Sequence, residues 1–306
     1  MAEKERTLVI KELASSLGNF DPFSKKHPYY FKDYNDNLIG NKMNPIHKEM
    51  FEEGSGSELN DSVTPAKAKA IDSSSMLSYN FFRNIDEQHP LQIDEITYNK
   101  VFFEVKLRTL QKSNMPANID VVLLSTDGTK ALFIESKFLE YLIYDNNELS
   151  KTYLNEDSYF DDNEERKLLI LLANQYNNLK NKRYNYGIKQ NICHLIGISN
   201  LKCSEKAKGI FKKQYKNKEQ LLILKANEYY FMNVLFEPKN DKAHPFFDQY
   251  TKDLKNIDIP VGIKKKYIYK SFIMTYKKIF EYLEKSNTID KNKREKLLHR
   301  YIMHHQ

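Results

Sequence analysis

The residues of this sequence that stand out for their chemistry are two carboxylates and an amine: Asp120, Glu135 and Lys137. Carboxylates hold Mg²⁺ in proteins, usually together with phosphate oxygens and water. A lysine beside them can orient or deprotonate an attacking water, or stabilise negative charge that develops on a phosphate. These residue types predict metal-assisted hydrolysis of a phosphate ester, provided that the fold brings them together.

A hairpin is the element expected to do so. The apolar runs Val121–Ser125 and Lys130–Ile134 flank Asp127-Gly128, and Asp-Gly between β-forming runs favours a two-residue type I′ turn. Residues of both parities are apolar in both runs, which is typical of strands covered on both faces. The alternative, a surface hairpin with charges at its base, fits this two-sided apolarity poorly.

The loop predicts that Asp120 lies opposite Glu135 on the neighbouring strand. Side chains placed so have Cβ atoms about 4.5–5.5 Å apart, where like charges destabilise the pair. Lys137 projects from the same face as Glu135, because strand side chains alternate with a period of two. Two acids and one amine at the end of a buried hairpin favour a bound divalent cation.

This pattern resembles the PD-(D/E)xK nuclease superfamily, whose signature is an Asp at the start of one strand and (D/E)-x-K at the end of the next. Asp120 and Glu135-Ser136-Lys137 match it, although Ile119 stands where the family's Pro would be. The resemblance implies an α/β, restriction-endonuclease-like fold with a mixed central sheet flanked by helices. It further implies Mg²⁺, with Mn²⁺ as a substitute, and the backbone carbonyl of Ser136 as an additional ligand.

The wider stretch from Gly54 to Gln175 resembles a group of uncharacterised bacterial proteins within this superfamily. Such proteins usually take a further carboxylate from an upstream helix, and Glu58 is the first choice, Glu104 the second and Glu140 a weaker third. A Gln on the helix after the E-x-K strand often reaches the site, which suggests Gln175. For each of these acids a surface position is the alternative, and for Gln175 a bond to backbone.

The composition excludes several classes of protein. No apolar run approaches the length of a membrane span, and the N-terminus lacks the hydrophobic region of a signal peptide, so we expect a cytoplasmic protein without a membrane partner. Cys193 and Cys203 form no zinc or disulfide pattern. No G-x-x-x-x-G-K-[ST] loop is present, so we expect no nucleotide cofactor.

Positive charge is concentrated in the last third of the chain. Residues 201–306 contain 24 Lys and Arg against 12 Asp and Glu, a net charge of +12, which leaves −5 for residues 1–200 of the 306-residue chain. Lysines such as Lys264–Lys266, interleaved with aromatic residues, suit contact with DNA phosphates. A Lys-, Asn- and Tyr-rich composition from an AT-rich genome is an equally good explanation.

Three regions are expected. Residues 1–53 form an extension packed on the core, residues 54–200 the nuclease core, and residues 201–306 a basic region, mixed and then helical, that is either separate or part of the same domain. Helices are expected at Thr7–Leu17, Ile46–Glu53, Ser73–Phe82, Glu164–Lys180, Lys264–Lys285 and Ile289–Met303, and a further helix is expected to begin near Glu58 with Ser57 as its cap. Strands are expected at Ile96–Leu107 and Asn191–Ser199, and His194 is expected to be a packed residue of the second strand.

The leading interpretation is a Mg²⁺-dependent DNA endonuclease that hydrolyses phosphodiester bonds in a restriction or anti-phage defence system. DNA is then the partner, and a homodimer is left open. The alternative is a catalytically inactive nuclease-like module that binds nucleic acid or a protein partner. Metal binding at the Asp120 and Glu135 cluster distinguishes the two, because an inactive scaffold has no reason to keep it.

Overall fold

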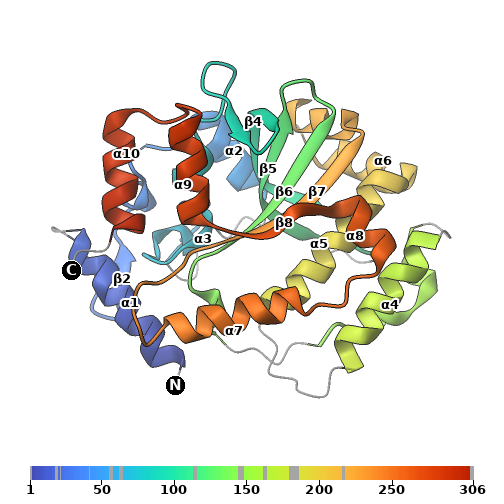
Figure 1. The fold of residues 1–306 in the computed structure, drawn as a ribbon, viewed down its shortest axis with the longest axis horizontal. Coiled ribbons are helices and arrows are strands. Elements are labelled where there is room, and N and C mark those ends of the chain that lie inside the picture. The colour runs from blue at the N-terminus through green and yellow to red at the C-terminus, as the bar shows by residue number, and fades with distance from the viewer. Residues whose placement is uncertain are drawn as a thin grey trace.

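A computed structural model describes residues 2–17, 20, 22–40, 42–54, 58–61, 65–112, 116–143, 148–160, 164–178, 186–215 and 218–303. At its centre lies a six-stranded sheet in the order β3-β4-β5-β6-β7-β8 (Figure 1). Its strands are β3 (Leu91–Ile93), β4 (Ile96–Leu107), β5 (Ala117–Ser125), β6 (Lys130–Lys137), β7 (Glu228–Leu235) and β8 (Ile268–Thr275). Strands β3 to β6 are antiparallel neighbours, whereas β6, β7 and β8 run parallel, so the sheet is mixed.

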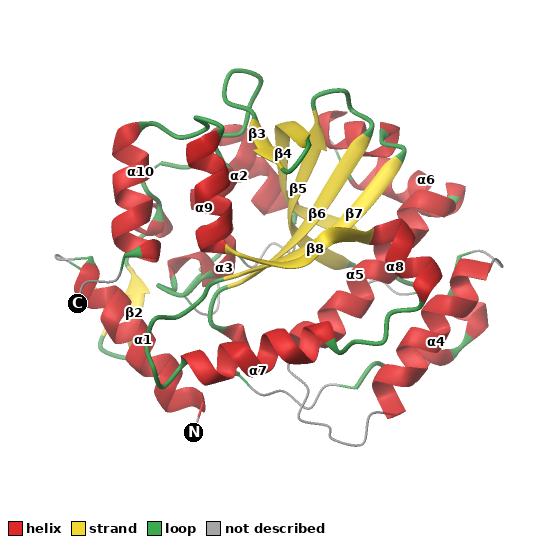
Figure 2. Ribbon diagram, viewed as in Figure 1, coloured by secondary structure: helices red, strands yellow, loops and turns green. Residues whose placement is uncertain are grey.

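Helices flank the sheet on both sides (Figure 2). They are α1 (Ala2–Ser16), α2 (Pro45–Glu53), α3 (Ser74–Phe82), α4 (Glu164–Asn178), α5 (Tyr186–Cys203), α6 (Glu205–Gln214), α7 (His244–Lys255), α8 (Val261–Tyr267), α9 (Tyr276–Lys285) and α10 (Lys291–Leu297), and β1 (Pro22–Ser24) pairs with β2 (His27–Phe31) outside the main sheet. Helices α2, α3 and α9 pack against sheet strands, as do α5 and α8. None of the helices in the described ranges combines the length and apolar character that a membrane crossing requires.

The predicted hairpin forms the centre of the sheet, as β5 and β6. Val121 lies opposite Ile134 and Leu124 opposite Ala131, in the predicted register. From Val121 to Leu124 and from Ala131 to Ile134, side chains of both parities are at most 3% exposed, because helices cover both faces. The α/β class, the mixed sheet and the central position of the hairpin are thus confirmed.

The prediction of a type I′ turn at Asp127-Gly128 is wrong. Of the two loop residues only Gly128 has a positive φ, at 70°, whereas a type I′ turn requires it at both. The Gly128 N–H donates to the Ser125 carbonyl at 2.8 Å, and the Asp127 carboxylate accepts from Thr129 N–H at 2.9 Å and from the Ser125 hydroxyl at 2.6 Å. Asp127 thus stabilises the turn through its side chain rather than its backbone conformation.

Other local predictions hold where capping residues mark a helix. Ser73 accepts from Met76 N–H at the start of α3, and Asn44 accepts from Ile46 N–H at the start of α2, which has Pro45 in its first turn. The helix predicted from Glu164 is α4, and the predicted strand Ile96–Leu107 is β4.

Two predicted elements have the wrong type. Asn191–Ser199 is not a strand but part of the 18-residue helix α5, in which Ile188, Ile192 and Leu195 are buried at helical spacing. A short apolar run does not by itself distinguish a buried strand from a buried helix, and here the longer flanks decide.

The helix predicted at Lys264–Lys285 is also wrong. Ile268–Thr275 forms β8, which pairs with β7, so that α8 and α9 are separate helices. Pairing at the edge of a sheet overrides helical periodicity here. The basic region 201–306 therefore supplies two strands of the central sheet.

Candidate active site

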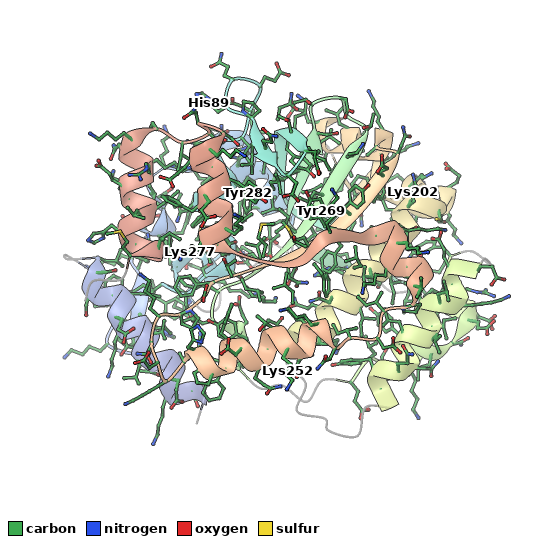
Figure 3. All side chains as sticks on the ribbon, in the orientation of Figure 1. His89, Lys202, Lys252, Tyr269, Lys277 and Tyr282 are labelled. Atoms are coloured by element: carbon green, nitrogen blue, oxygen red, sulfur yellow. The ribbon has the colours of Figure 1, made fainter. Side chains whose placement is uncertain are left out.

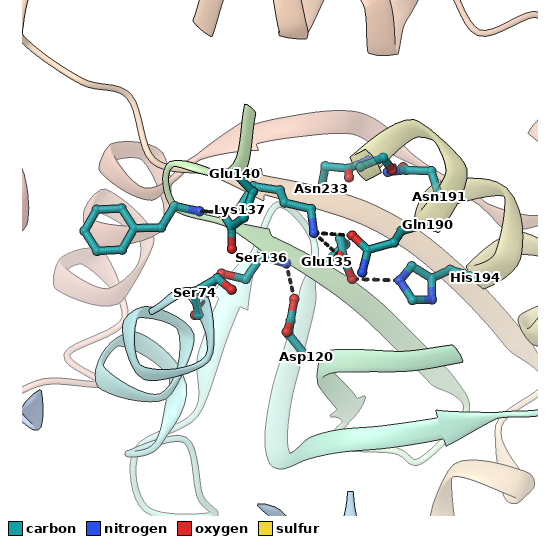
Figure 4. A network of polar contacts seen from close by, with 12 residues as sticks. Ser74, Asp120, Glu135, Ser136, Lys137, Glu140, Gln190, Asn191, His194 and Asn233 are labelled. Atoms are coloured by element: carbon teal, nitrogen blue, oxygen red, sulfur yellow. Dashed lines mark hydrogen bonds and ion pairs between the residues drawn. The ribbon is translucent and has the colours of Figure 1, made fainter. Parts of the chain in front are cut away.

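The signature residues lie at the adjoining ends of β5 and β6 (Figure 4). Asp120, Glu135 and Lys137 line one cavity of about 710 Å³. The pairing of β5 with β6 ends at Val121 and Ile134, one residue before the two carboxylates. Instead, Ser136 N–H donates to Asp120 Oδ2 at 2.7 Å, so that a backbone contact holds the aspartate beside the E-x-K segment. The Ser136 amide thus ties the E-x-K segment to Asp120.

Lys137 is 4% exposed, and its amine lies between two side-chain acceptors. It donates to Glu135 Oε1 at 2.5 Å and to Gln190 Oε1 at 2.6 Å. Burial would lower the pKa of Lys137, but the negative charges of Glu135 and then Glu140 outweigh it and raise this pKa above its ordinary value. The side chain is therefore a fixed ammonium, suited to stabilising negative charge rather than to removing a proton.

Glu135 is held from its other side by a histidine. His194 Nε2 lies 2.8 Å from Glu135 Oε2, in an ion-pair contact whose alignment is not that of a hydrogen bond, and neither atom has a hydrogen-bond partner within the described part of the chain. Burial would raise the pKa of Glu135, but the charges of Lys137 and His194 prevail and lower it to about 2. Glu135 is therefore an ionised carboxylate at neutral pH.

Two other acids of the cavity, Asp120 and Glu104, have raised pKa values because they are buried near like charges. Burial, followed by the charges of Glu135 and Glu104, raises the pKa of Asp120 well above its usual range. Burial, followed by the charges of Glu58 and Glu135, raises the pKa of Glu104 to about 8. A cation arriving in this cavity would relieve both groups.

Glu104 enters the cavity through an unusual backbone conformation. Its φ is 51°, in the middle of β4, between the regular pairs that Phe103 and Val105 make with β5. A non-glycine residue in this region is strained and persists only where its surroundings enforce it. Gly54 makes room for it, since a Cβ added there would lie 2.7 Å from the Cβ of Glu104. The strain thus accompanies a buried acid that lines the cavity.

Glu58 also lines the cavity, but not from a helix. Residues 58–61 are non-helical, so the predicted helix start is wrong, and its proposed cap Ser57 lies outside the described residues. The carboxylate of Glu58 accepts from the Ser75 hydroxyl at 3.0 Å and pairs with Lys67 at 3.2 Å. Side-chain contacts to α3, rather than a helix of its own, position Glu58.

The predicted Gln175 is elsewhere. It donates to Asp258 Oδ2 at 3.1 Å and lines a separate cavity of about 220 Å³. Helix α5 supplies the glutamine instead: Gln190, Cys193 and His194 line the cavity of the signature residues. Positions i, i+3 and i+4 share one helix face, so these residues would have been found had this stretch been predicted as a helix.

No protein-family model matches this chain, and no curated protein or solved structure is significantly similar to it. The function must therefore be argued from the site itself.

The donors of the cavity match a hard cation in type. Mg²⁺ and Mn²⁺ prefer carboxylate and amide oxygens, and the buried atoms Glu135 Oε2 and Asn118 Oδ1 in the cavity lining have no hydrogen-bond partner among the described residues. Within the described ranges, however, no three His, Cys, Asp or Glu side chains are grouped closely enough to hold one ion. Lys137 and His194 occupy the space on either side of Glu135, so ligation would require these contacts to open.

Proposed function

We propose that this chain is a metal-dependent DNA endonuclease that hydrolyses phosphodiester bonds. The observation that carries the proposal is that Asp120, Glu135 and Lys137, from the ends of the two central strands, line one cavity together with the acids Glu58 and Glu104. The mixed sheet with this hairpin at its centre is consistent with a restriction-endonuclease-like fold, which is part of the proposal.

The acids of the cavity would hold the metal. Asp120 and Glu135 are its primary ligands, with Glu58 or Glu104 completing the set. A bound Mg²⁺ or Mn²⁺ ion lowers the pKa of water and neutralises charge on a phosphate oxygen. The raised pKa values of Asp120 and Glu104 support this assignment, because buried acids that repel one another gain most from a cation.

Lys137 acts on the phosphate rather than on the proton of the attacking water. Its raised pKa keeps the ammonium charged, and a charged donor in a buried site stabilises negative charge that develops in the transition state. Gln190 accepts from this ammonium and fixes its direction, while His194 holds the far oxygen of Glu135. Both are positioning residues in this proposal.

Exposed lysines of residues 201–306 could grip the DNA backbone, but they are distributed over several elements. Lys252 on α7 and Lys277 on α9 lie far apart in Figure 3. Lys266 on α8 pairs with Glu165, and Lys264 and Lys265 beside it are exposed. The α8 lysines are therefore the candidates for non-specific phosphate contact.

The alternative is a nuclease-like module that binds without cutting. Thermal unfolding in chelator and in saturating Mg²⁺ or Mn²⁺ separates the two, since a ligand that binds only the folded state raises its melting temperature. The nuclease proposal expects a rise that Asp120→Asn abolishes. A module without a metal site shows the same melting temperature in all three conditions.

The direct test incubates the purified protein with supercoiled plasmid, single-stranded DNA and RNA in Mg²⁺ and in Mn²⁺. Cleavage of DNA should fall by a factor of ~10² or more in Lys137→Ala, which removes the transition-state contact. Lys277→Ala, an exposed lysine on α9 that does not line the cavity, is the matched control and should cut at the wild-type rate. Wild-type cleavage by Lys137→Ala, or degradation of RNA alone, contradicts the proposal.

A further inference from the structure

Most of the proposed catalytic groups are buried within their cavity rather than placed on a surface, and Asp120 is the partly exposed member. Glu135 is 2% exposed, Lys137 and Glu104 are each 4% exposed, and Glu58 is 7% exposed. A phosphodiester can reach these groups only by entering the cavity. The depth of the site therefore restricts the shape of the substrate as well as its chemistry.

The size of the cavity is that of a small-ligand site. Its volume of about 710 Å³ lies within the ~300–1,000 Å³ typical of pockets that enclose a single small molecule. This is room for a nucleotide or two of an extended strand. A duplex presents its phosphates on a convex cylinder with the second strand alongside, so its scissile phosphate would stop at the rim.

The cavity has walls from distant parts of the chain. Arg6 of α1 and Tyr30 of β2 line it together with the segment that contains Lys67, and Tyr153 and Lys189 line it from η4 (Lys151–Leu154) and α5. Helices α3 and α5 flank the end of β6, as Ser74 and Gln190 mark in Figure 4. An incoming polymer must therefore pass between walls.

These walls contain the kinds of group with which proteins bind a single strand. Proteins that bind single-stranded DNA combine cations along the backbone with aromatic faces on which unpaired bases stack. Lys189 is one cation of these walls, Arg6 and Lys67 are two more that are paired with Asp72 and Glu58, and the aromatic residues are Tyr30 and Tyr153, both partly exposed. Duplex DNA offers no free base face to such tyrosines.

We infer that the substrate of this site is a single DNA strand, including the unpaired segments of gapped or frayed DNA, and not an intact duplex. The inference rests on the proposed nuclease function and adds to it the form of the substrate. Burial of most of the reacting groups, the cavity volume, and Lys189 with the two tyrosines of the walls support this form of substrate.

The test compares three end-labelled substrates of one sequence: a single strand, a full duplex, and a duplex interrupted by a short single-stranded gap. The single strand should be cut ~10-fold faster than the duplex or more, the scale of one stacked base, and cuts in the gapped molecule should be confined to the gap. Equal cleavage of duplex and single strand, or cuts spread over the paired arms, overturns this inference and leaves the nuclease proposal intact. If no DNA is cut in either metal, both fall.

Binding provides a second readout that needs no turnover. In a Lys137→Ala background, fluorescence anisotropy in chelator should show tighter binding of the single strand than of the duplex. Lys189→Glu should weaken single-strand binding and lower the slope of log affinity against log salt by roughly one, the effect of one lost phosphate contact. Lys277→Glu makes the same charge change outside the cavity and should alter neither the affinity nor the slope. Equal effects of the two reversals would place the strand elsewhere and contradict the inference.

Discussion

Glu135 and His194 approach to 2.8 Å, which joins the end of β6 to the middle of helix α5. The other oxygen of Glu135 accepts a hydrogen bond from the ammonium of Lys137, so one buried carboxylate lies between Lys137 and His194. Glu135→Gln should therefore destabilise the metal-free protein, by about 3–5 kcal/mol if the buried pair is broken outright. The free energy of unfolding in urea, determined in the presence of chelator for both proteins, measures this loss. Repulsion between Asp120 and Glu135 alone predicts the opposite sign, so an unchanged or raised stability would mean that this repulsion dominates.

Glu104 should make stability depend on pH. Its folded-state pKa of about 8 is raised above the usual value near 4.5, so its contribution is most favourable below the lower value and is lost as pH rises through the upper one. The melting temperature of Glu104→Gln should equal that of wild type near pH 4.5 and exceed it by a few degrees near pH 8. Melting temperatures in chelator across this window test the shift. A constant difference between the two proteins would contradict it.

Gly54 should be required for the strained conformation of Glu104. Gly54→Ala places a Cβ 2.7 Å from the Cβ of Glu104, and overpacking of this kind typically costs ~1–3 kcal/mol. Gly209→Ala is the matched control, because open space surrounds that position inside helix α6, where alanine is favoured over glycine by ~0.5–1 kcal/mol. Chemical unfolding should show a lower free energy of unfolding for Gly54→Ala and a higher one for Gly209→Ala. An unchanged free energy of unfolding in Gly54→Ala would indicate that Glu104 moves freely.

Gln190 should position the ammonium of Lys137. Gln190→Ala removes an acceptor at 2.6 Å from a side chain that is almost wholly buried, and we expect cleavage to fall by about 10-fold, the effect of a misplaced catalytic group. Rescue by Gln190→Glu, which keeps an oxygen at this place, would separate positioning from general damage to the fold. Gln175→Ala, in the other cavity, should leave the cleavage rate unchanged. Equal losses for Gln190→Ala and Gln175→Ala would reverse this assignment.

The lysines of α8 should contribute to non-specific DNA affinity. Lys264→Glu with Lys265→Glu should weaken binding to all sequences alike and lower the slope of log affinity against log salt, by roughly one per lost contact. Lys266 is left intact because it pairs with Glu165. Lys239→Glu with Lys242→Glu supplies the same change of charge at two other exposed lysines. If the two double variants behave identically, only net charge matters and α8 is not the DNA surface.

The sequence by itself determined the hairpin and what it carries. Asp127-Gly128 specifies a tight turn locally, and apolar residues of both parities require cover on both faces. Since register follows from the turn and the buried faces, Asp120, Glu135 and Lys137 come to one end of the strands without any distant contact. Ser73 likewise begins α3 through a bond to its own neighbours.

Tertiary structure decided the surroundings of that hairpin. The stretch around His194 contains an apolar run that fits a strand or a buried helix equally well, and packing of α5 on β4, β5 and β7 selects the helix that brings Gln190 and His194 to the site. The left-handed conformation of Glu104 depends on Gly54, far away in the sequence. Local propensities differ by about 1 kcal/mol per residue or less, whereas burial of one large apolar side chain contributes about 1.5–3 kcal/mol. Contacts between distant segments therefore override local preference at these positions, and sequence spacing alone does not reveal them.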